Sequence, residues 1–213
     1  MHIRSLILVA LALTLGACSN VYYDAMEKVG VHKRDILVDR VEAARDTQSE
    51  TKEQFLTAME QFRQVVDFSG GDLEREYRRL DATLQRSERG ATEVRERIDA
   101  VEAVSEALFD EWRTELEQYS SDRLRAESQR KYDATRVRYA RLIASMQAAE
   151  EKLEPVLVPL RDQVLFMKHN LNARAIAGLS GELARVQVSV DRLVRDMDEA
   201  IAEADRFIAT LQQ

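Results

Sequence analysis

The sequence has few of the residues that build disulfides, metal sites and tight turns, with 1 Cys, 3 His, 2 Pro and 7 Gly among 213 residues. One Cys excludes an internal disulfide framework and a Cys-cluster zinc site. The histidines, His2, His32 and His169, leave little for a metal site or a histidine-dependent catalytic triad. So few Gly and Pro residues cannot supply the turns of a many-stranded sandwich or barrel.

What the chain has in abundance is typical of long helices. Hydrophobic residues make up 45% and charged residues 32%, with many Ala, Glu, Leu and Arg. The net charge of −7 opposes nucleic-acid binding as a main role. The sequence has no glycine-rich phosphate loop, no serine nucleophile elbow and no His-Glu-x-x-His motif. We therefore expect a protein that is not an enzyme and holds no cofactor and no metal.

The N-terminus resembles a secretion signal. His2 and Arg4 precede an apolar run over residues 6–15, which is too short for a bilayer core that needs about 20 residues. Directly after it, Leu15-Gly16-Ala17-Cys18 resembles a bacterial lipobox. We predict a lipoprotein signal peptide over residues 1–17 and lipidation of Cys18. The alternative is an ordinary signal peptide followed by an incidental cysteine.

The residue after Cys18 bears on the predicted location. It is Ser19 rather than Asp, which by resemblance to enterobacterial sorting favours the outer membrane over the inner membrane. Several acyl chains, at about 0.8 kcal/mol per buried methylene, anchor a protein stably. We expect a lipid anchor and short segment over 18–32 and a single helical bundle domain over 33–213, on the periplasmic face of the outer membrane.

Apolar residues recur at alternating spacings of four and three, the pattern of helices packed in a bundle or coiled coil. Such stripes place Phe55 and Trp112 in the core. The third stripe shifts by one residue at Pro155 and Pro159, which predicts a kink. Short connections make successive helices antiparallel, so we expect an all-α, elongated antiparallel bundle or coiled coil of about four long helices. The predicted helices lie near 24–68, 72–119, 122–171 and 174–212.

Charges support folding back at the first two turns. The window 102–117 carries six acids and one base, whereas 122–141 carries seven bases and three acids. The basic window has an alternative role in binding an anionic polymer or lipid headgroups. The predicted pairs are Asp67–Arg75, Glu60–Arg79, Lys52–Glu88 and Asp46–Arg95 at the first turn, and Glu117–Arg125, Asp110–Lys131 and Glu106–Arg136 at the second.

One candidate site follows from this topology. Four antiparallel helices bring the first and third turns to one end of the bundle, opposite the start of the first helix. We expect a partner-binding tip there, and the alternative is ordinary turn and helix-cap chemistry. The candidate tip residues are Gly70, Gly71, His169, Asn170, Asn172 and Arg174.

Several segments resemble the bacterial DUF2959 family. The matching stretches cover residues 29–41, from Val29-Gly30-Val31-His32 to Asp39-Arg40-Val41, then Lys52-Glu53-Gln54-Phe55, and residues 168–176 around Lys168-His169-Asn170-Leu171-Asn172. The resemblance extends over most of the chain after the signal. It implies the architecture and a bacterial envelope setting, and it implies no catalytic or binding residue.

Two classes of function follow from these observations. The first is a lipid-anchored structural or adaptor protein that presents a helical bundle to an envelope protein partner of unknown identity. The second is a bundle that carries a lipid or another apolar ligand. In both, the membrane partner is reached through the N-terminal lipid, no nucleic acid is bound, and homo-oligomerisation as a coiled coil is possible.

Overall fold

The computed structural model describes residues 23, 26, 30–68, 70, 72–172, 176 and 178–212. Within these residues the ordered elements are helices and no strand occurs, which confirms the predicted all-α class. The helices are α2 (Lys33–Val66), α3 (Leu73–Leu116), α4 (Asp122–Glu150), α5 (Leu153–His169) and α7 (Ser180–Leu211).

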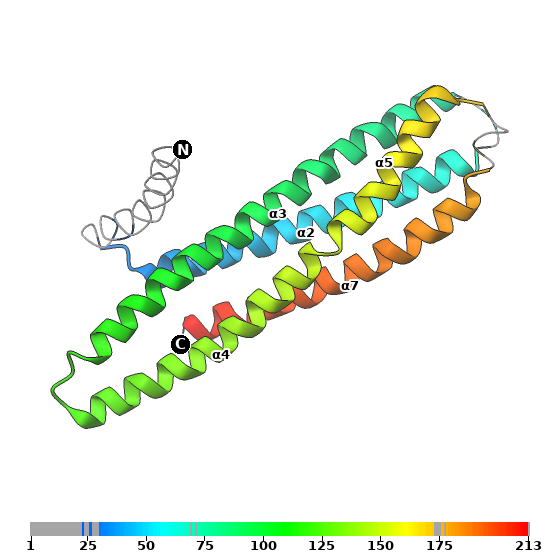
Figure 1. Cartoon of the computed structure of the whole chain (residues 1–213). Coiled ribbons are helices and arrows are strands. Elements are labelled where there is room, and N and C mark those ends of the chain that lie inside the picture. The colour runs from blue at the N-terminus through cyan, green and yellow to red at the C-terminus, as the bar shows by residue number, and fades with distance from the viewer. Residues whose placement is uncertain are drawn as a thin grey trace, which may run out of the picture.

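The helices form one elongated antiparallel bundle, shown in Figure 1. α2 packs against α3 on one side and α7 on the other. α4 and α5 follow one another along the groove between α3 and α7 and together act as the fourth helix. We call the end with the α2–α3 and α5–α7 turns the far end, and the end with the α3–α4 turn the near end.

Two of the turns end in a side chain that caps the following helix. The backbone N–H of Arg75 donates to the carboxylate of Asp72 at 3.0 Å, so Asp72 satisfies a free amide at the start of α3. Ser121 does the same for α4 through the N–H of Leu124, at 3.4 Å. Gly70 has φ +153°, which residues with a side chain rarely adopt, and so helps α2 reverse into α3.

Three boundaries differ most from the prediction. α2 begins at Lys33 rather than at 24, because Gly30 adopts φ +87° and residues 31–32 are not helical. The predicted helix 122–171 is two helices separated by a turn at 151–152, just before Pro155, which lacks the N–H that continues a helix. α7 begins at Ser180 rather than at 174, after a turn at 178–179.

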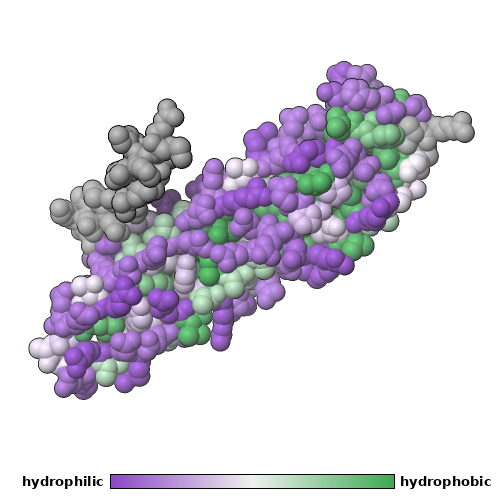
Figure 2. Space-filling model, viewed as in Figure 1, coloured by the Kyte–Doolittle hydropathy of each residue, from purple (hydrophilic) through white to green (hydrophobic). Residues whose placement is uncertain are grey.

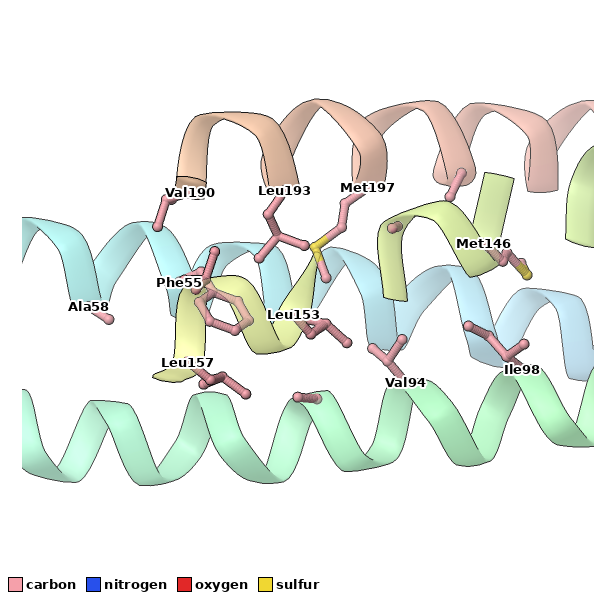
Figure 3. Close-up of a cluster of buried hydrophobic side chains, with 14 of the residues drawn as sticks. Phe55, Ala58, Val94, Ile98, Met146, Leu153, Leu157, Val190, Leu193 and Met197 are labelled. Atoms are coloured by element: carbon pink, nitrogen blue, oxygen red, sulfur yellow. The ribbon is translucent and has the colours of Figure 1, made fainter. Parts of the chain in front are cut away.

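The core is a continuous strip of buried side chains along the bundle axis. Figure 3 shows Phe55 of α2, Leu153 of α5 and Met197 of α7 pointing toward one another. These three side chains are fully buried, as predicted for Phe55. Trp112 is only half-buried, so its placement in the core was wrong. The strip also buries Gln48, and its side-chain amide has no hydrogen-bond partner among the described residues.

The predicted ion pairs are wrong, although the helices do fold back as expected. At the first turn Lys52 bonds Asp198 of α7 at 2.9 Å rather than Glu88, and Glu88 bonds Arg161 of α5 at 2.7 Å. α2 and α3 pack closely at Gly90, where an added Cβ would lie 2.7 Å from Oγ1 of Thr51. Eight of the other predicted partners bond elsewhere, in Arg75–Glu76, Arg79–Glu76, Arg63–Glu60, Arg45–Asp46, Arg95–Glu150, Arg125–Asp122, Arg113–Asp110 and Lys131–Glu127. The remaining four, Asp67, Glu106, Glu117 and Arg136, form no ion pair with a described residue.

Candidate functional site

The two turns of the predicted tip lie together at the far end of the bundle (Figure 1). His169 is the exposed last residue of α5, and Asn172 is exposed in the turn that follows. Gly70 lies in the other turn, and no hydrogen bond within the described residues joins it to His169. Gly71 and Arg174 fall outside the described residues. The structure thus brings the two turns to one end without joining these residues into one bonded site.

Asn170 has a structural task at this end. Its side-chain Nδ2 donates to the carbonyl of Phe166 at 2.9 Å, and its backbone N–H donates to the carbonyl of Met167 at 3.1 Å. Both carbonyls belong to the last turn of α5, where no following amide of the helix can satisfy them. The turn continues with the N–H of Asn172 donating to the carbonyl of Asn170, at 2.7 Å. The alternative of cap chemistry therefore accounts for Asn170.

Beside this turn, α5 carries an exposed apolar face that the sequence analysis missed. The exposed fractions are 47% for Val158, 57% for Leu165 and 42% for Phe166. Spacings of seven and eight residues put all three on one face of a helix, and the buried Val164 and Met167 lie on another. We call these three residues the α5 face. Figure 2 shows hydrophobic surface gathered at this end of the molecule.

A clue to the α5 face was present in the sequence. Residues 164–167 are four consecutive apolar side chains, and a single buried stripe accommodates only two of them, Val164 and Met167. The remaining two must lie outside the stripe. Heptad counting selects the buried positions and gives no weight to apolar residues between them.

Comparison with known protein families identifies the chain. The family model of DUF2959, described as a protein of unknown function, matches residues 22–211. The chain belongs to the DUF2959 family. The match spans all the helices described above, so the DUF2959 region is the bundle itself. No curated protein and no solved structure matches the chain.

Polar bonds close the DUF2959 bundle along the α2–α7 interface. Arg45 bonds Asp205 at 3.0 Å, Lys52 bonds Asp198 at 2.9 Å, and the guanidinium of Arg63 donates to the side-chain oxygen of Gln187 at 3.0 Å. Each step forward along α2 is matched by an equal step backward along α7, which is the register of antiparallel helices. The hydrogen bonds that the guanidinium of Arg45 donates to the carboxylates of Asp46 and Asp205 raise the pKa of Arg45.

Surface hollows of the DUF2959 protein are lined mainly by charged and small side chains. One lies between α4 and α7 and includes Arg141, Ala144, Asp196 and Glu203. Within the described ranges, no group of three His, Cys, Asp or Glu residues is placed to hold a metal ion. Nor does any described helix combine the length and apolar composition needed to cross a membrane. The predicted lipobox, Leu15 to Cys18, lies outside both the described residues and the family match.

Proposed function

We propose that this protein is a lipid-anchored adaptor of the bacterial envelope, without catalytic activity. In this proposal Cys18 carries the lipid and the bundle stands on the periplasmic face of the outer membrane. α2 begins toward the near end of the bundle, and the α5 face lies toward the far end (Figure 1). α2 has 34 residues, and at about 1.5 Å per residue it spans about 50 Å. The bundle would thus hold the α5 face well away from the anchor.

The α5 face is the observation that carries the adaptor proposal. Exposed large apolar side chains that cluster on one surface are typical of sites that bind another protein. The flanking surface is charged, with Arg161 and Glu88 bonded beside α5. The partner that fits is an envelope protein presenting an amphipathic helix, whose apolar stripe would cover Leu165 and Phe166.

Site-specific crosslinking in native envelopes tests this proposal. A photoreactive residue at position 165 should give one dominant adduct, and Phe166→Glu in the same chain should remove it. The matched control places the photoreactive residue at Val137, an exposed apolar position of α4 nearer the other end. Equal adducts at 165 and 137, or an adduct that survives Phe166→Glu, would show that the α5 face is not the binding surface.

The anchor is tested separately from the adaptor role. Mass spectrometry of the protein from its host should find an acylated N-terminal peptide beginning at Cys18. Cys18→Ala should move the protein out of the membrane fraction. An unmodified Cys18 in membrane-associated protein would refute the lipid anchor and leave the crosslinking result standing.

An alternative function is a carrier of a lipid or other apolar ligand. The interruption at residues 151–152 favours it, because a break between α4 and α5 is a point at which α5 can move away from the core. Solvent extraction of the purified protein followed by mass spectrometry should then recover a small apolar molecule near one per chain. Protein that carries no such molecule, together with a crosslinked partner at 165, would favour the adaptor.

A further inference from the structure

The first part of α4 carries an excess of positive charge that its ion pairs do not neutralise. Residues 123–141 contain seven Arg or Lys residues and two acids, in a chain whose net charge is −7. The ion pairs that these bases form lie within α4, as between Arg125 and Asp122 and between Lys131 and Glu127, and none reaches α3. Four of the seven bases form no ion pair with a described residue, namely Arg130, Arg136, Arg138 and Arg141.

Four of the seven bases lie on the side of α4 that faces away from α3. Ser128 marks the side toward α3, because its hydroxyl accepts a hydrogen bond from the indole N–H of Trp112 at 2.9 Å. Arg130 is two residues beyond Ser128 and therefore about 200° further around the helix axis. Spacings of seven, seven and four residues extend this line in both directions. We call the exposed residues along it the basic strip, which consists of Arg123, Arg130, Val137, Arg138 and Arg141.

Acidic side chains lie beside both ends of the basic strip. At its start, the carboxylate of Glu127 pairs with Arg123 at 4.0 Å. At its other end, Arg141 borders a hollow with three acids of α7, which are Asp196, Glu199 and Glu203. The positive charge without a partner is therefore concentrated in the middle of the strip, at Arg130 and Arg138.

The acids of α3 lie on the other side of α4 from the basic strip. Glu102, Glu106 and Asp110 border a hollow together with Arg136, which is not part of the strip. A helix with its side chains is about 10 Å across, and charges in physiological salt are screened over about 8 Å. An anion outside the bundle therefore meets the positive charge of the strip, although the whole chain is negatively charged.

The composition of the basic strip matches a membrane surface. Phosphate oxygens accept paired hydrogen bonds from a guanidinium, so arginines suit phospholipid headgroups. Val137 lies among the arginines with an exposed fraction of 54%, and the boundary between headgroups and acyl chains accommodates such an apolar side chain. A soluble anionic polymer would bind the arginines but leave Val137 in water. An interface with a protein is usually centred on aromatic side chains in fitted pockets, whereas the strip combines arginines with one valine.

We propose that the basic strip binds the headgroups of anionic phospholipids. The inference rests on the proposed lipid anchor, because α2 and the strip both begin toward the near end, where the anchor would hold the strip within reach of the membrane (Figure 1). Anionic lipids attract basic side chains close to the surface. The strip covers residues 123–141, or about 27 Å of helix at about 1.5 Å per residue. Its contact would set which side of the bundle faces the membrane, with α4 against the headgroups.

Fluorescence quenching of the full-length protein, purified from its host and reconstituted into vesicles, tests the proposal. A fluorescent amino acid at position 137 reports how far acrylamide in the water reaches the strip. Its quenching constant should be at least about twofold lower in phosphatidylcholine vesicles that contain phosphatidylglycerol than in pure phosphatidylcholine. High salt should abolish this difference, because it screens the arginines from the lipid. The same fluorophore at position 188, an exposed apolar position of α7, is the control and should be quenched equally in both vesicles.

Arginine substitutions test the source of the protection. Replacing Arg130→Gln and Arg138→Gln together should abolish the difference between the two kinds of vesicle. The matched control is the pair Arg192→Gln and Arg195→Gln on α7, which removes two exposed arginines that form no ion pair with a described residue. That pair should leave the protection at position 137 unchanged. Circular dichroism at 222 nm shows that both variants retain their helices.

Three outcomes would overturn the proposal. These are equal quenching at position 137 in both kinds of vesicle, an equal loss of protection in the two arginine variants, and protection by dextran sulfate as strong as that by phosphatidylglycerol. The last would assign the strip to an anionic polymer. Failure of the lipid anchor gives a different result, because the protein would then not float with pure phosphatidylcholine vesicles. Protection at position 137 by added phosphatidylglycerol vesicles would in that case still support the strip.

Discussion

Replacing Gly90 with alanine tests how tightly α2 and α3 pack. An added Cβ at this position would lie 2.7 Å from Oγ1 of Thr51, 3.2 Å from its Cγ2, and 2.8 Å from Oε1 of Gln54. The amide of Gln54 ends a flexible side chain, but Thr51 is buried and branched at Cβ, so it cannot move aside without displacing its neighbours. Alanine at position 90 must therefore push the two helices apart or strain Thr51.

Whether Gly90→Ala lowers or raises the free energy of unfolding distinguishes overpacking from helix propensity. Alanine inside a helix is more favourable than glycine by about 1 kcal/mol. Overpacking a buried interface costs about 1–3 kcal/mol. We expect Gly90→Ala to lower the free energy of unfolding by about 1 kcal/mol. For a chain of this size that corresponds to a decrease in Tm of about 2–4 °C.

Gly181 provides the matched control, because it lies in the first turn of α7 and an added Cβ there has no neighbour within 4 Å. Gly181→Ala should be neutral or stabilising, by up to about 1 kcal/mol. Urea unfolding followed at 222 nm measures both variants. Thr51→Ala removes both of the close side-chain atoms, so Gly90→Ala should stabilise in that background. If Gly90→Ala stabilises the wild-type chain as Gly181→Ala does, then α2 and α3 do not pack as closely at Gly90 as described.

Three further perturbations have expected outcomes. Gln48→Leu should raise the free energy of unfolding by about 1–3 kcal/mol, because it removes a buried amide that has no hydrogen-bond partner in the described chain. Urea titration measures this change, and a destabilised variant would contradict it. A double-mutant cycle on Lys52 and Asp198 should give a coupling of about 0.2–1 kcal/mol that shrinks in 1 M NaCl, and a salt-independent coupling would refute the surface ion pair. Burial raises the pKa of Tyr139. The stabilisation linked to this shift is complete below about pH 10, the pKa of tyrosine in the unfolded chain. It is lost as the pH rises through the higher pKa of the folded state. Tyr139→Phe should therefore reduce the decrease of the urea unfolding midpoint with pH above about pH 10. If the midpoint of the variant decreases as steeply as that of the wild type, Tyr139 is not the cause of the decrease.

The buried stripes could be predicted because burial repeats with the helix period. Every position of the last stripe is buried or partly buried, and these positions are Leu179, Leu183, Val186, Val190, Leu193, Met197, Ala200, Ala204, Phe207 and Leu211. Heptad spacing needs only the rule that apolar faces meet in the core. The break between α4 and α5 could also be predicted in part, because the shift of the stripe at Pro155 indicates an irregularity in the helix. Whether that irregularity is a bend or a turn depends on local hydrogen bonds, which the spacing does not contain.

The ion pairs could not be predicted from the same spacing. Lys52 lies where α2 meets both α3 and α7, and it bonds Asp198 of α7 rather than Glu88 of α3. Exposed pairs differ in energy by less than about 1 kcal/mol, so small differences in distance decide which one forms. A stripe shows which side of a helix is buried, but it does not show which neighbour lies on each flank.

The meeting of the two turns could be predicted from the topology, but the exposed apolar residues beside them could not. The topology correctly put the turns at 70 and 169–172 at one end of the bundle. Asn170 proved to be a helix cap, and the apolar residues Leu165 and Phe166 supply the exposed surface there. They were missed because the prediction looked for polar residues in turns, while the exposed surface lies on the outer side of a helix.

The polar bonds between α2 and α7 have a mechanical consequence. If the chain is held at the start of α2 and loaded at the α5 face, the tension runs along the axis of α2. The contacts at Arg45, Lys52 and Arg63 then resist sliding simultaneously, because they are spread along the length of the helix. A pull at right angles would instead peel the same contacts apart one after another. The bundle is therefore built to withstand force along its length better than across it.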